Sequence, residues 1–504
     1  MACRGLPSRP RFYQFVPVAP GIPPHFRRLP RREFGRKPPE TASMPTDFLD
    51  YSAAIEYLFS LINYERTGDS HPYPFRLRRM RRLIDRLGLS GVAGAELPLV
   101  HIAGTKGKGS TATMVASMLT ANGLKTGLYT SPHLVDIEER FQVDFRQPDR
   151  EEMVALVKEL RTAADCLARS GAGSPTFFES TTAIALAHFK QSGCQAVVLE
   201  VGLGGLLDST NVCSPRVSAI TSIGLDHQHI LGDTLAEIAA QKAGILKSGV
   251  PVVSGVRDGE AADVIAQTAE QRGAPLFQLG RDFDFHLESL ADGWRSRLTL
   301  TSDRTEIRPR VGWEIPLAGA HQGQNAAIAC AILDLLDPAH DLTRPEDQAA
   351  GLAQVRCAGR IERFLLADGC EVILDTAHNA ESVSALCDFL ERLSPGKSVT
   401  VIFGTSRDKP YREMLQRLLP VASRLLLTRY LSNPRYREPQ ELLAALPTDA
   451  PALIEDQPVK ALQLARSGPI RPSDQRIVIC GSFFLAAELR PLLQQAAAEG
   501  LGSA

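Results

Sequence analysis

The sequence of 504 residues lacks the features of a membrane protein, of a disulfide-stapled protein and of a basic nucleic-acid coat. It contains no run of eighteen uncharged apolar residues, so a membrane-spanning helix is not expected. Its nine cysteines are scattered and form no CxxC pair, which predicts free thiols in a reducing cytoplasm rather than a zinc site. Its 56 basic and 57 acidic residues leave a formal net charge of −1, which argues against broad binding to nucleic acid. What remains is an ordinary globular composition, 44% hydrophobic and 22% charged.

The first 43 residues differ in composition from the rest of the chain. They hold nine prolines, nine Lys or Arg residues and only two acids, Glu33 and Glu40. Proline at this density opposes helix and sheet, and the segment has no apolar core of a secretory signal. We predict a disordered Pro/Arg-rich extension over 1–43, or a start codon placed too early, with Met44 as the true start. An organellar transit peptide is the alternative, although proline argues against the amphipathic helix that it needs.

From about residue 47 onward, short apolar runs alternate with helix-like segments. Helices are predicted at 51–64, 76–87, 111–121, 234–246 and 485–498. Strands are predicted at 99–103, 126–130, 196–201, 217–223 and 250–254, and, after Arg360, at 371–375, 399–403, 424–428 and 476–480. Strands that alternate with helices predict crossovers and a mostly parallel sheet.

Residues 277–316 break this rhythm. Alternating patterns at 298–301 and 306–311 predict a small antiparallel sheet at the side of the domain. The whole pattern predicts an α/β protein, with a P-loop-containing, mostly parallel-sheet ATPase domain over 44–357 and a smaller α/β domain over 358–504.

A glycine-rich loop between a strand and a helix is the strongest local signal. The loop reads GTKGKGST over 104–111, so its spacing differs from the common GxxxxGK[ST]. Glycines let backbone N–H groups turn toward phosphate oxygens, and the helix N-terminus adds partial positive charge. We therefore expect this loop to bind ATP through Gly104, Thr105, Gly107, Lys108, Gly109, Ser110 and Thr111.

Other polar residues also follow predicted strands. Glu200 and the pair Asp226–His227 end strands of the first series, where ligands of open α/β sheets collect. A carboxylate beside a phosphate loop suits Mg²⁺, although Glu200 could also merely cap a loop. Lys242 lies in a helix of small apolar residues, and it could be solvated or buried and chemically special. Asp375, three residues before His378, can point with it into one cleft of the second domain.

Taken together, these segments resemble the folylpolyglutamate synthase/dihydrofolate synthase family of the Mur ligase superfamily. The resemblance runs from about residue 51 to 487 and rests on ordered motifs: HIAGTKGKGST (101–111), LYTSPHL (128–134), FFESTTAIA (177–185), LEVGLGGLLDSTN (199–211), TSIGLDHQHILGDTLAEIAAQKAGILK (221–247), HQGQNAA (321–327), GRIERF (359–364) and DTAHN (375–379).

The resemblance implies ATP-dependent amide ligation. A folate carboxylate attacks the γ-phosphate of ATP to give an acyl phosphate, and the amine of L-glutamate then displaces phosphate. The family pattern implies catalytic roles for Lys108, Lys242, Asp375 and His378.

The same pattern implies the binding sites. It gives nucleotide contacts to Asn325, Arg360 and Asp375, and a pterin-holding loop that includes Ser131, Pro132, His133 and Arg140. It gives Mg²⁺, at two sites, the ligands Ser131, Glu200, His227 and Lys242. In the family the lysine that matches Lys242 is carbamylated, which makes it an anion.

Two alternatives stay open beside this interpretation: a P-loop ATPase module that ligates nothing, and another Mur-type amino-acid ligase. Arg360, Asp375 and His378 argue against the first, and the short chain before the phosphate loop argues against the second. Lys106 and Leu206 replace residues that are commonly Asn and polar in the family, so the pterin substrate stays open. We expect a cytoplasmic monomer that binds small-molecule substrates, with no nucleic acid or membrane as partner.

Overall fold

The computed structural model describes residues 50–62, 77–94, 97–316, 319–339, 341–393, 397–467 and 470–501. Chain contacts divide the protein into Met1–Thr46 and Asp47–Ala504, and all described residues lie in the second unit. The extension predicted over 1–43 therefore falls outside the described residues. Among the helices that the structure describes, none has the length and apolarity needed to cross a membrane.

The first domain is built on a seven-stranded sheet in the order β3-β2-β4-β1-β5-β6-β7. The strands are β1 (Leu99–Ala103), β2 (Thr126–Tyr129), β3 (Phe141–Val143), β4 (Ala196–Glu200), β5 (Val217–Ile220), β6 (Val252–Ser254) and β7 (Leu276–Gln278). All neighbours are parallel except β2 and β3. Strands buried on both faces are continuously apolar, which is why β1, β4 and β5 were predictable.

Helices cover both faces of this sheet and form two large hydrophobic cores, beside a smaller cluster that includes residues of β5 and β6. One core contains residues of α5 (Lys108–Ala121), α11 (Ala320–Leu336) and α12 (Pro345–Ala353). The other contains residues of α1 (Tyr51–Ser60), α3 (Leu77–Arg86), α4 (Ser90–Ala93), α6 (Arg150–Arg169) and α7 (Phe177–Gln191). The remaining helices of this domain are α8 (Gln228–Leu231), α9 (Leu235–Ala243) and α10 (Gly259–Gln271), with 3₁₀ turns at Ile137–Arg140 and Ser209–Val212.

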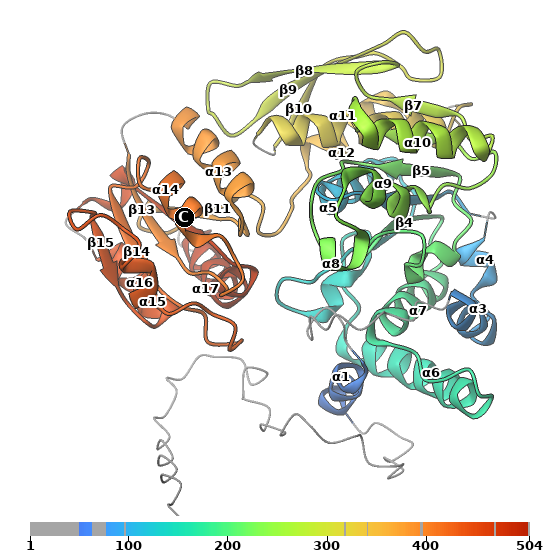
Figure 1. Ribbon diagram of the computed structural model, residues 1–504, viewed down its shortest axis with the longest axis horizontal. Coiled ribbons are helices and arrows are strands. Elements are labelled where there is room, and N and C mark those ends of the chain that lie inside the picture. Colours follow the sequence, from blue (N-terminus) through green and yellow to red (C-terminus); the bar gives the residue numbers. More distant parts are fainter. Residues whose placement is uncertain are drawn as a thin grey trace, which may run out of the picture. The chain divides into compact units, whose positions relative to one another are not determined.

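A three-stranded antiparallel sheet lies beside α11, in the order β10-β9-β8 (Figure 1). Its strands are β8 (Phe283–Ser289), β9 (Ser296–Ser302) and β10 (Arg310–Ile315). This confirms the small sheet predicted for residues 277–316. The strand predicted at 306–311 is wrong in position, because Ile307 turns back to the Arg304 carbonyl and pairing begins only at Arg310.

The second domain is built on a six-stranded sheet in the order β11-β12-β16-β13-β14-β15. Its strands are β11 (Glu362–Leu365), β12 (Glu371–Leu374), β13 (Ser398–Phe403), β14 (Arg424–Leu427), β15 (Ala452–Ile454) and β16 (Gln475–Cys480). Its helices are α13 (Ala380–Arg392), α14 (Tyr411–Leu418), α15 (Pro439–Leu443), α16 (Pro458–Arg466) and α17 (Phe483–Leu501). Only β11 runs antiparallel to its neighbour, so the α/β prediction is confirmed for both domains. The boundary predicted at 357 falls between α12 and β11 and stays a prediction.

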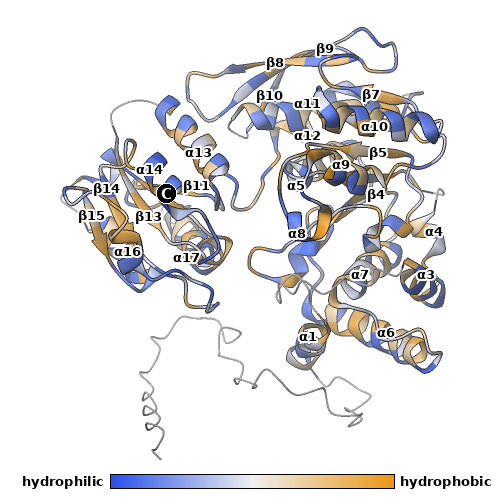
Figure 2. Ribbon diagram, in the orientation of Figure 1, coloured by the Kyte–Doolittle hydropathy of each residue, from blue (hydrophilic) through white to orange (hydrophobic). Residues whose placement is uncertain are grey.

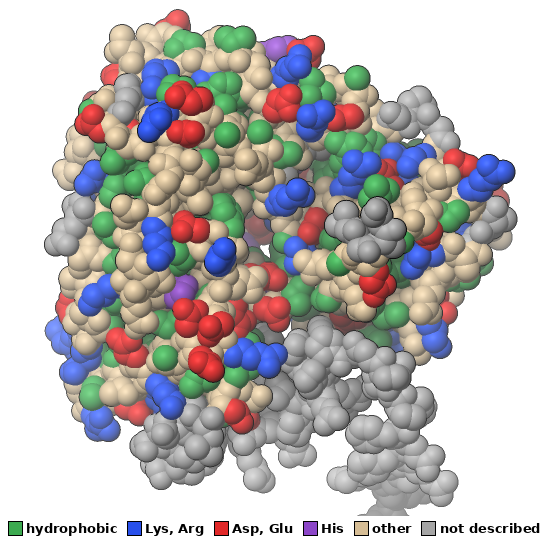
Figure 3. All heavy atoms as spheres, turned by 180° about the vertical axis from the view of Figure 1, so that it is seen from behind, with side chains coloured by type: hydrophobic (Ala, Val, Ile, Leu, Met, Phe, Trp, Pro, Cys, Tyr) green, Lys and Arg blue, Asp and Glu red, His purple; other side chains and the backbone are tan. Residues whose placement is uncertain are grey.

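Hydropathy follows this architecture. The strands of both sheets are mostly hydrophobic, whereas α3 is strongly hydrophilic (Figure 2). Lys and Arg side chains are interspersed with Asp and Glu over the face seen in Figure 3, in keeping with a net charge of −1.

Several predicted boundaries are wrong. The first helix ends at Ser60 rather than at residue 64, because Leu61 is extended. The strand predicted at 217–223 ends at Ile220, and the helix predicted at 234–246 spans Leu235–Ala243 with Thr234 as its N-cap.

Candidate active site

The phosphate loop connects β1 to α5 and depends on two close approaches. Gly107 caps α5 at φ +82°, and a Cβ there would lie 2.3 Å from Oδ1 of Asn325. A Cβ on Gly109 would lie 3.3 Å from Oε2 of Glu200. Asn325, predicted to contact the nucleotide, and Glu200, predicted to bind Mg²⁺, therefore pack directly against the loop.

A small pocket opens beside this loop. It is lined by Gly104, Thr105, Lys108, Val201, Gly202, Leu203, Gly204, Asp226, His227, Leu231 and Lys242. The lining of this one pocket thus includes three residues predicted for catalysis or metal binding: Lys108, His227 and Lys242. Asp226 also lines it and was not among the predicted site residues, although its place before His227 in the sequence was a usable signal.

Lys242 is buried at the last turn of α9, only 4% exposed. Its Nζ donates a hydrogen bond of 3.0 Å to the Gly104 carbonyl of the phosphate loop. Burial, with a further contribution from the Lys108 ammonium, lowers its pKa from 10.5 to about 7. This lysine is therefore not a solvated helix residue, and a large fraction of it is neutral at pH 7.

Glu200 ends β4 on the other side of the loop. Its Oε2 accepts a hydrogen bond of 3.0 Å from the Ser131 backbone N–H. Burial raises the pKa of this carboxyl, and the Lys108 ammonium opposes that shift. Lys108 is thus an electrostatic neighbour of both Glu200 and Lys242.

The four predicted metal ligands fall into two groups around Lys108. Ser131 and Glu200 contact each other, and His227 and Lys242 line the pocket. His227 is a half-exposed residue at φ +51°, and its Nε2 lies 3.8 Å from Oδ1 of Asp226. Within the described part of the chain, no three His, Cys, Asp or Glu side chains gather as a metal cluster.

The loop predicted to hold the pterin carries Pro132 after a cis peptide bond. Arg140 lies beneath this loop, only 1% exposed, with its guanidinium 5.4 Å from the Phe177 ring centroid. Its Nε donates a hydrogen bond of 2.8 Å to Nδ1 of His133. Arg140 therefore supports the loop from below, whereas Ser131 lies at its start beside Glu200.

In the second domain, Asp375 follows β12 and is buried. Its carboxylate accepts hydrogen bonds from the backbone N–H groups of Ile361 (2.8 Å) and Ala377 (2.7 Å). Burial raises its pKa, and the Arg360 guanidinium opposes that shift. Arg360 and Asp375, both predicted to contact nucleotide, are therefore electrostatic neighbours.

His378 lies in the same segment. Its Nδ1 is 2.8 Å from the Thr376 carbonyl, which can only accept, so Nδ1 carries the proton and Nε2 is left as an acceptor. Burial lowers its pKa, which keeps the ring neutral at pH 7. The Phe483 ring lies 6.2 Å from His378 and 5.7 Å from the Arg360 guanidinium.

A buried hydrogen-bond chain behind the pocket was not predicted. Nε2 of His101 lies 2.8 Å from the Thr210 hydroxyl, which donates to Oδ1 of Asp208 at 2.5 Å. Oδ2 of Asp208 accepts the Leu203 backbone N–H at 3.0 Å, which fixes one wall of the pocket. The hydroxyl and the acid belong to the LDSTN motif, but only the fold brings His101 to them.

Lys106, which replaces a common Asn of the family, points away from the loop. Its backbone N–H donates to the Ser222 hydroxyl at 2.9 Å, and its carbonyl accepts from the Thr221 hydroxyl at 2.6 Å. Its ammonium pairs with Glu381 in the first turn of α13.

Comparison with known proteins agrees with this geometry. Residues 102–333 match the Mur ligase middle domain, and residues 359–483 match the Mur ligase glutamate ligase domain. The chain is 34% identical to the dihydrofolate synthase/folylpolyglutamate synthase of Bacillus subtilis, over 83% of this chain and 95% of that protein. It is also 34% identical to the folylpolyglutamate synthase of Lacticaseibacillus casei, over 88% of this chain and 99% of that protein.

Solved structures show the same likeness. The folylpolyglutamate synthase of Thermotoga maritima has a TM-score of 0.76 at 28% identity, covering 88% of this chain and 96% of that one. E. coli FolC in complex with DHPP and ADP has a TM-score of 0.74 at 28% identity, covering 88% and 98%. The order of motifs, the two α/β domains and these matches together place the chain in the folylpolyglutamate synthase/dihydrofolate synthase family of Mur ligases.

Proposed function

We propose that this protein is an ATP-dependent ligase that joins L-glutamate to a folate through an amide bond. The observation that carries the proposal is the phosphate loop with buried Lys242 and Glu200 on either side of Lys108. The two curated relatives named above are folylpolyglutamate or dihydrofolate synthases, and this chain aligns with nearly their whole length. A solved relative holds ADP and DHPP, and another holds the ATP analogue AMPPCP.

The chemistry needs positioning and charge neutralisation more than covalent help. The folate carboxylate attacks the γ-phosphorus, ADP leaves, and an acyl phosphate forms. The glutamate amine then attacks the acyl carbon, and phosphate leaves. Lys108 stands where it neutralises charge on the transferring phosphoryl group, and the backbone of residues 107–111 at the α5 N-terminus supports the same role.

The residues around Glu200 fit Mg²⁺. This ion prefers oxygen ligands and is commonly held by one or two carboxylates together with substrate phosphates. The Glu200 carboxylate lies beside the phosphate loop, and Ser131, which contacts it through its backbone N–H, carries a hydroxyl oxygen that could serve as a second ligand. We propose that they hold it there, with His227 as a weaker contributor. Mg²⁺ bound there would neutralise phosphate charge.

We further propose that Lys242 is carbamylated. The neutral amine adds to CO₂, and the proton that it loses passes to water, which gives a carbamate with a negative charge and two oxygens. A pKa of about 7 supports this reaction, because it leaves neutral amine available at physiological pH. The carbamate would give the pocket the anionic ligand for a second Mg²⁺ that an ammonium cannot give.

Carbamylation is testable by ¹³C NMR of the protein in ¹³CO₂-saturated buffer. At fixed dissolved CO₂, we expect a carbamate signal that grows between pH 6 and 8, because the neutral fraction of Lys242 rises through its pKa of about 7. The signal should be absent in Lys242→Ala, which should be almost inactive and partly rescued by short carboxylic acids. Full activity with no carbamate signal would contradict the proposal.

Two second-domain residues complete the proposal. His378 has a neutral ring with a free Nε2 lone pair, which suits it to take a proton from the attacking amine. Arg360 and Asp375 form the charged pair that we propose contacts the nucleotide. We propose that the protein acts as a cytoplasmic monomer.

An assay with two candidate acceptors shows which of them the enzyme glutamylates. Purified protein is incubated with ATP, Mg²⁺ and L-glutamate, and with either dihydropteroate or tetrahydrofolate. We expect at least one acceptor to gain the mass of one glutamyl residue. Gain on dihydropteroate alone assigns a dihydrofolate synthase, gain on tetrahydrofolate alone a folylpolyglutamate synthase, and gain on both a bifunctional enzyme. No product with either acceptor would contradict the proposed function.

A further inference from the structure

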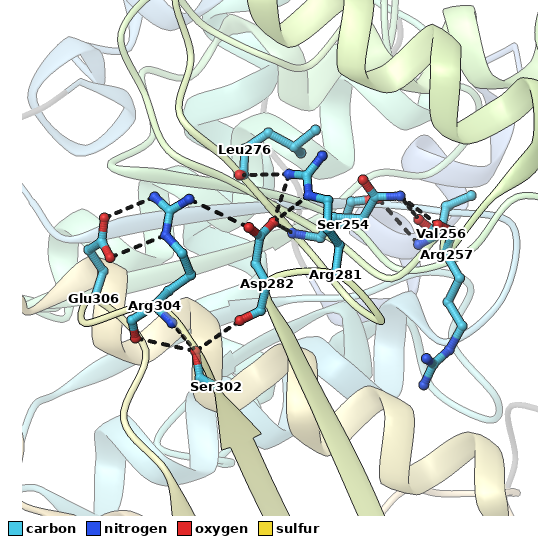
Figure 4. Close-up of polar contacts among 10 residues, drawn as sticks. Ser254, Val256, Arg257, Leu276, Arg281, Asp282, Ser302, Arg304 and Glu306 are labelled. Atoms are coloured by element: carbon cyan, nitrogen blue, oxygen red, sulfur yellow. Dashed lines mark hydrogen bonds and ion pairs between the residues drawn. The ribbon is translucent and has the colours of Figure 1, made fainter.

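The β8–β9 hairpin is fixed to the first domain at its base (Figure 4). The Asp282 carboxylate, which is 8% exposed, accepts the Gln278 backbone N–H at 2.7 Å and pairs with Arg281 at 2.7 Å and Arg304 at 3.5 Å. Phe283, at the start of β8, belongs to the main hydrophobic core of the first domain. The hairpin therefore extends from a rigid base next to β7.

The tip of the hairpin is a closed turn. The Leu290 N–H donates to the Arg295 carbonyl at 2.8 Å. Oδ1 of Asp292 accepts the backbone N–H groups of Trp294 (2.9 Å) and Arg295 (3.0 Å), and Oδ2 pairs with the Arg295 guanidinium at 2.8 Å. The first domain alone thus sets the backbone that carries Trp294.

Trp294 packs into the core of the second domain. Its ring meets the Phe389 ring edge to face, with centroids 5.4 Å apart. The Arg363 guanidinium covers it at 4.5 Å, and a Cβ on Gly293 would come within 3.0 Å of the Leu393 side chain. Every other described residue of this core cluster lies at or beyond Ile361. An indole between an aromatic edge and a guanidinium is a directional contact, so it fixes position as well as burying area.

The helix that Trp294 holds is the one that follows His378. α13 starts at Ala380, directly after the segment with Asp375 and His378, and Phe389 lies about 14 Å farther along it by the rise of an α-helix. At its first turn, Glu381 pairs with Lys106 of the phosphate loop. The first domain therefore contacts both ends of α13.

We propose that Trp294 is a positioning residue that sets where the second domain lies against the first. It holds the far end of α13, so the distance of Asp375 and His378 from the phosphate loop depends on this contact. This inference rests on the proposed function for its kinetic consequence. The contact itself is independent of the reaction.

The kinetic test compares Trp294→Ala, Trp294→Phe and, as a matched control, Trp313→Phe. Displacement from the attacking geometry costs about 10²-fold in rate per ångström, so we expect Trp294→Ala to lower kcat about 10²-fold and to raise the KM for glutamate. The Kd for ADP should rise much less than kcat falls, because the phosphate loop lies in the first domain and only the proposed contacts of Arg360 and Asp375 are displaced. Trp294→Phe should restore most of the activity, and Trp313→Phe should leave kinetics unchanged, because Trp313 packs on the first domain.

Unchanged glutamate KM and kcat in Trp294→Ala would overturn the proposal. So would a Trp294→Phe variant as impaired as Trp294→Ala, or a loss of ADP affinity as large as the loss of kcat. If Trp294→Ala does not fold, Phe389→Leu removes the partner ring from the other side, and the same kinetic outcomes apply.

A second readout does not need ligase activity. The chain has two tryptophans, so Trp313→Phe leaves Trp294 as the sole tryptophan emitter. A residue that positions the second domain must stay packed in the liganded protein, so its emission maximum should not move when ADP, Mg²⁺ and glutamate are added together. A red shift to the emission of a solvated indole would overturn the positioning role even if the enzyme is active. Failure of wild-type ligation would instead reject the proposed function alone.

Discussion

Lys108 interacts electrostatically with two other ionisable groups of the site. It neighbours Glu200 on one side and Lys242 on the other, and it lines the pocket beside the phosphate loop. Loss of one preorganised electrostatic group costs on the order of 10²-fold in turnover, so Lys108→Ala should lower kcat by about that factor or more at saturating ATP.

The matched control is the other lysine of the same loop. The Lys106 ammonium pairs with Glu381, and the two side chains are 41% and 81% exposed. An exposed pair contributes little, so Lys106→Asn should change kcat less than about fivefold. Near wild-type turnover in Lys108→Ala, or an equal loss in both variants, would remove Lys108 from the mechanism.

His101 gives a prediction about pH and stability. Burial lowers its pKa from 6.5 to about 3, so the folded protein keeps this ring neutral. Below pH 6.5, His101 binds a proton in the unfolded chain but not in the folded chain. The free energy of unfolding should therefore fall by up to about 1.4 kcal/mol per pH unit as pH drops from 6.5 toward 3.

Urea unfolding of wild type and His101→Gln between pH 7 and 5 isolates this contribution. The amide of Gln keeps a donor for Thr210 but does not titrate. The free energy of unfolding should change less steeply with pH in the variant, by up to the roughly 1.4 kcal/mol per pH unit that one proton contributes. Parallel slopes in the two proteins would show that His101 is protonated in the folded state.

At the scale of elements, capping links the second-domain site to the start of α13. Oδ1 of Asn379 accepts the Ser382 N–H at 2.9 Å, so the residue after His378 is the N-cap of this helix. Removing such a cap costs about 1 kcal/mol, so Asn379→Ala should lower the free energy of unfolding by about that amount. Asn379→Asp, which keeps the acceptor, should lower it far less, as measured by chemical denaturation. Equal losses in both variants would contradict the capping role.

Central strands were predictable from sequence, and edge strands were not. β1, β4 and β16 are buried throughout, and most of their residues are apolar, so each appears in the sequence as a short apolar stretch. β8, β11 and β15 lie at sheet edges with many partly exposed side chains. Their sequences mix polar and apolar residues, so they were not predicted as strands. The strand at β10 was displaced in the prediction because Arg308 and Arg310 turn toward buried Asp334, which no local pattern reveals.

Much of the candidate site was predictable for a topological reason. Glu200 ends β4 and Asp226 follows β5 in one sheet, Asp375 follows β12 in the other, and the carboxyl ends of parallel strands share one edge of their sheet. What the sequence could not reveal is how side chains from different elements meet. Packing between elements distant in sequence sets three such contacts. They are the contact of Arg140 with Phe177, the His101–Thr210–Asp208 chain and the contact of Trp294 with Phe389.

At the scale of the whole molecule, the proposed mechanism takes its ionisable groups from both domains. The first domain supplies Lys108, Glu200 and Lys242, and the second supplies Asp375 and His378. Trp294 and the Lys106–Glu381 pair join the two halves. A nucleotide switch would need only the first half.

The most direct measurement is therefore ADP formation in an omission series. Purified protein with ATP and Mg²⁺ is assayed with folate acceptor and glutamate together, with each alone, and with neither, while the glutamylated product is counted by mass spectrometry. The proposed ligase predicts sustained ADP release only when both are present, with one ADP per glutamyl residue added. Equal ADP release without acceptor or without glutamate, and no glutamylated product, would contradict it.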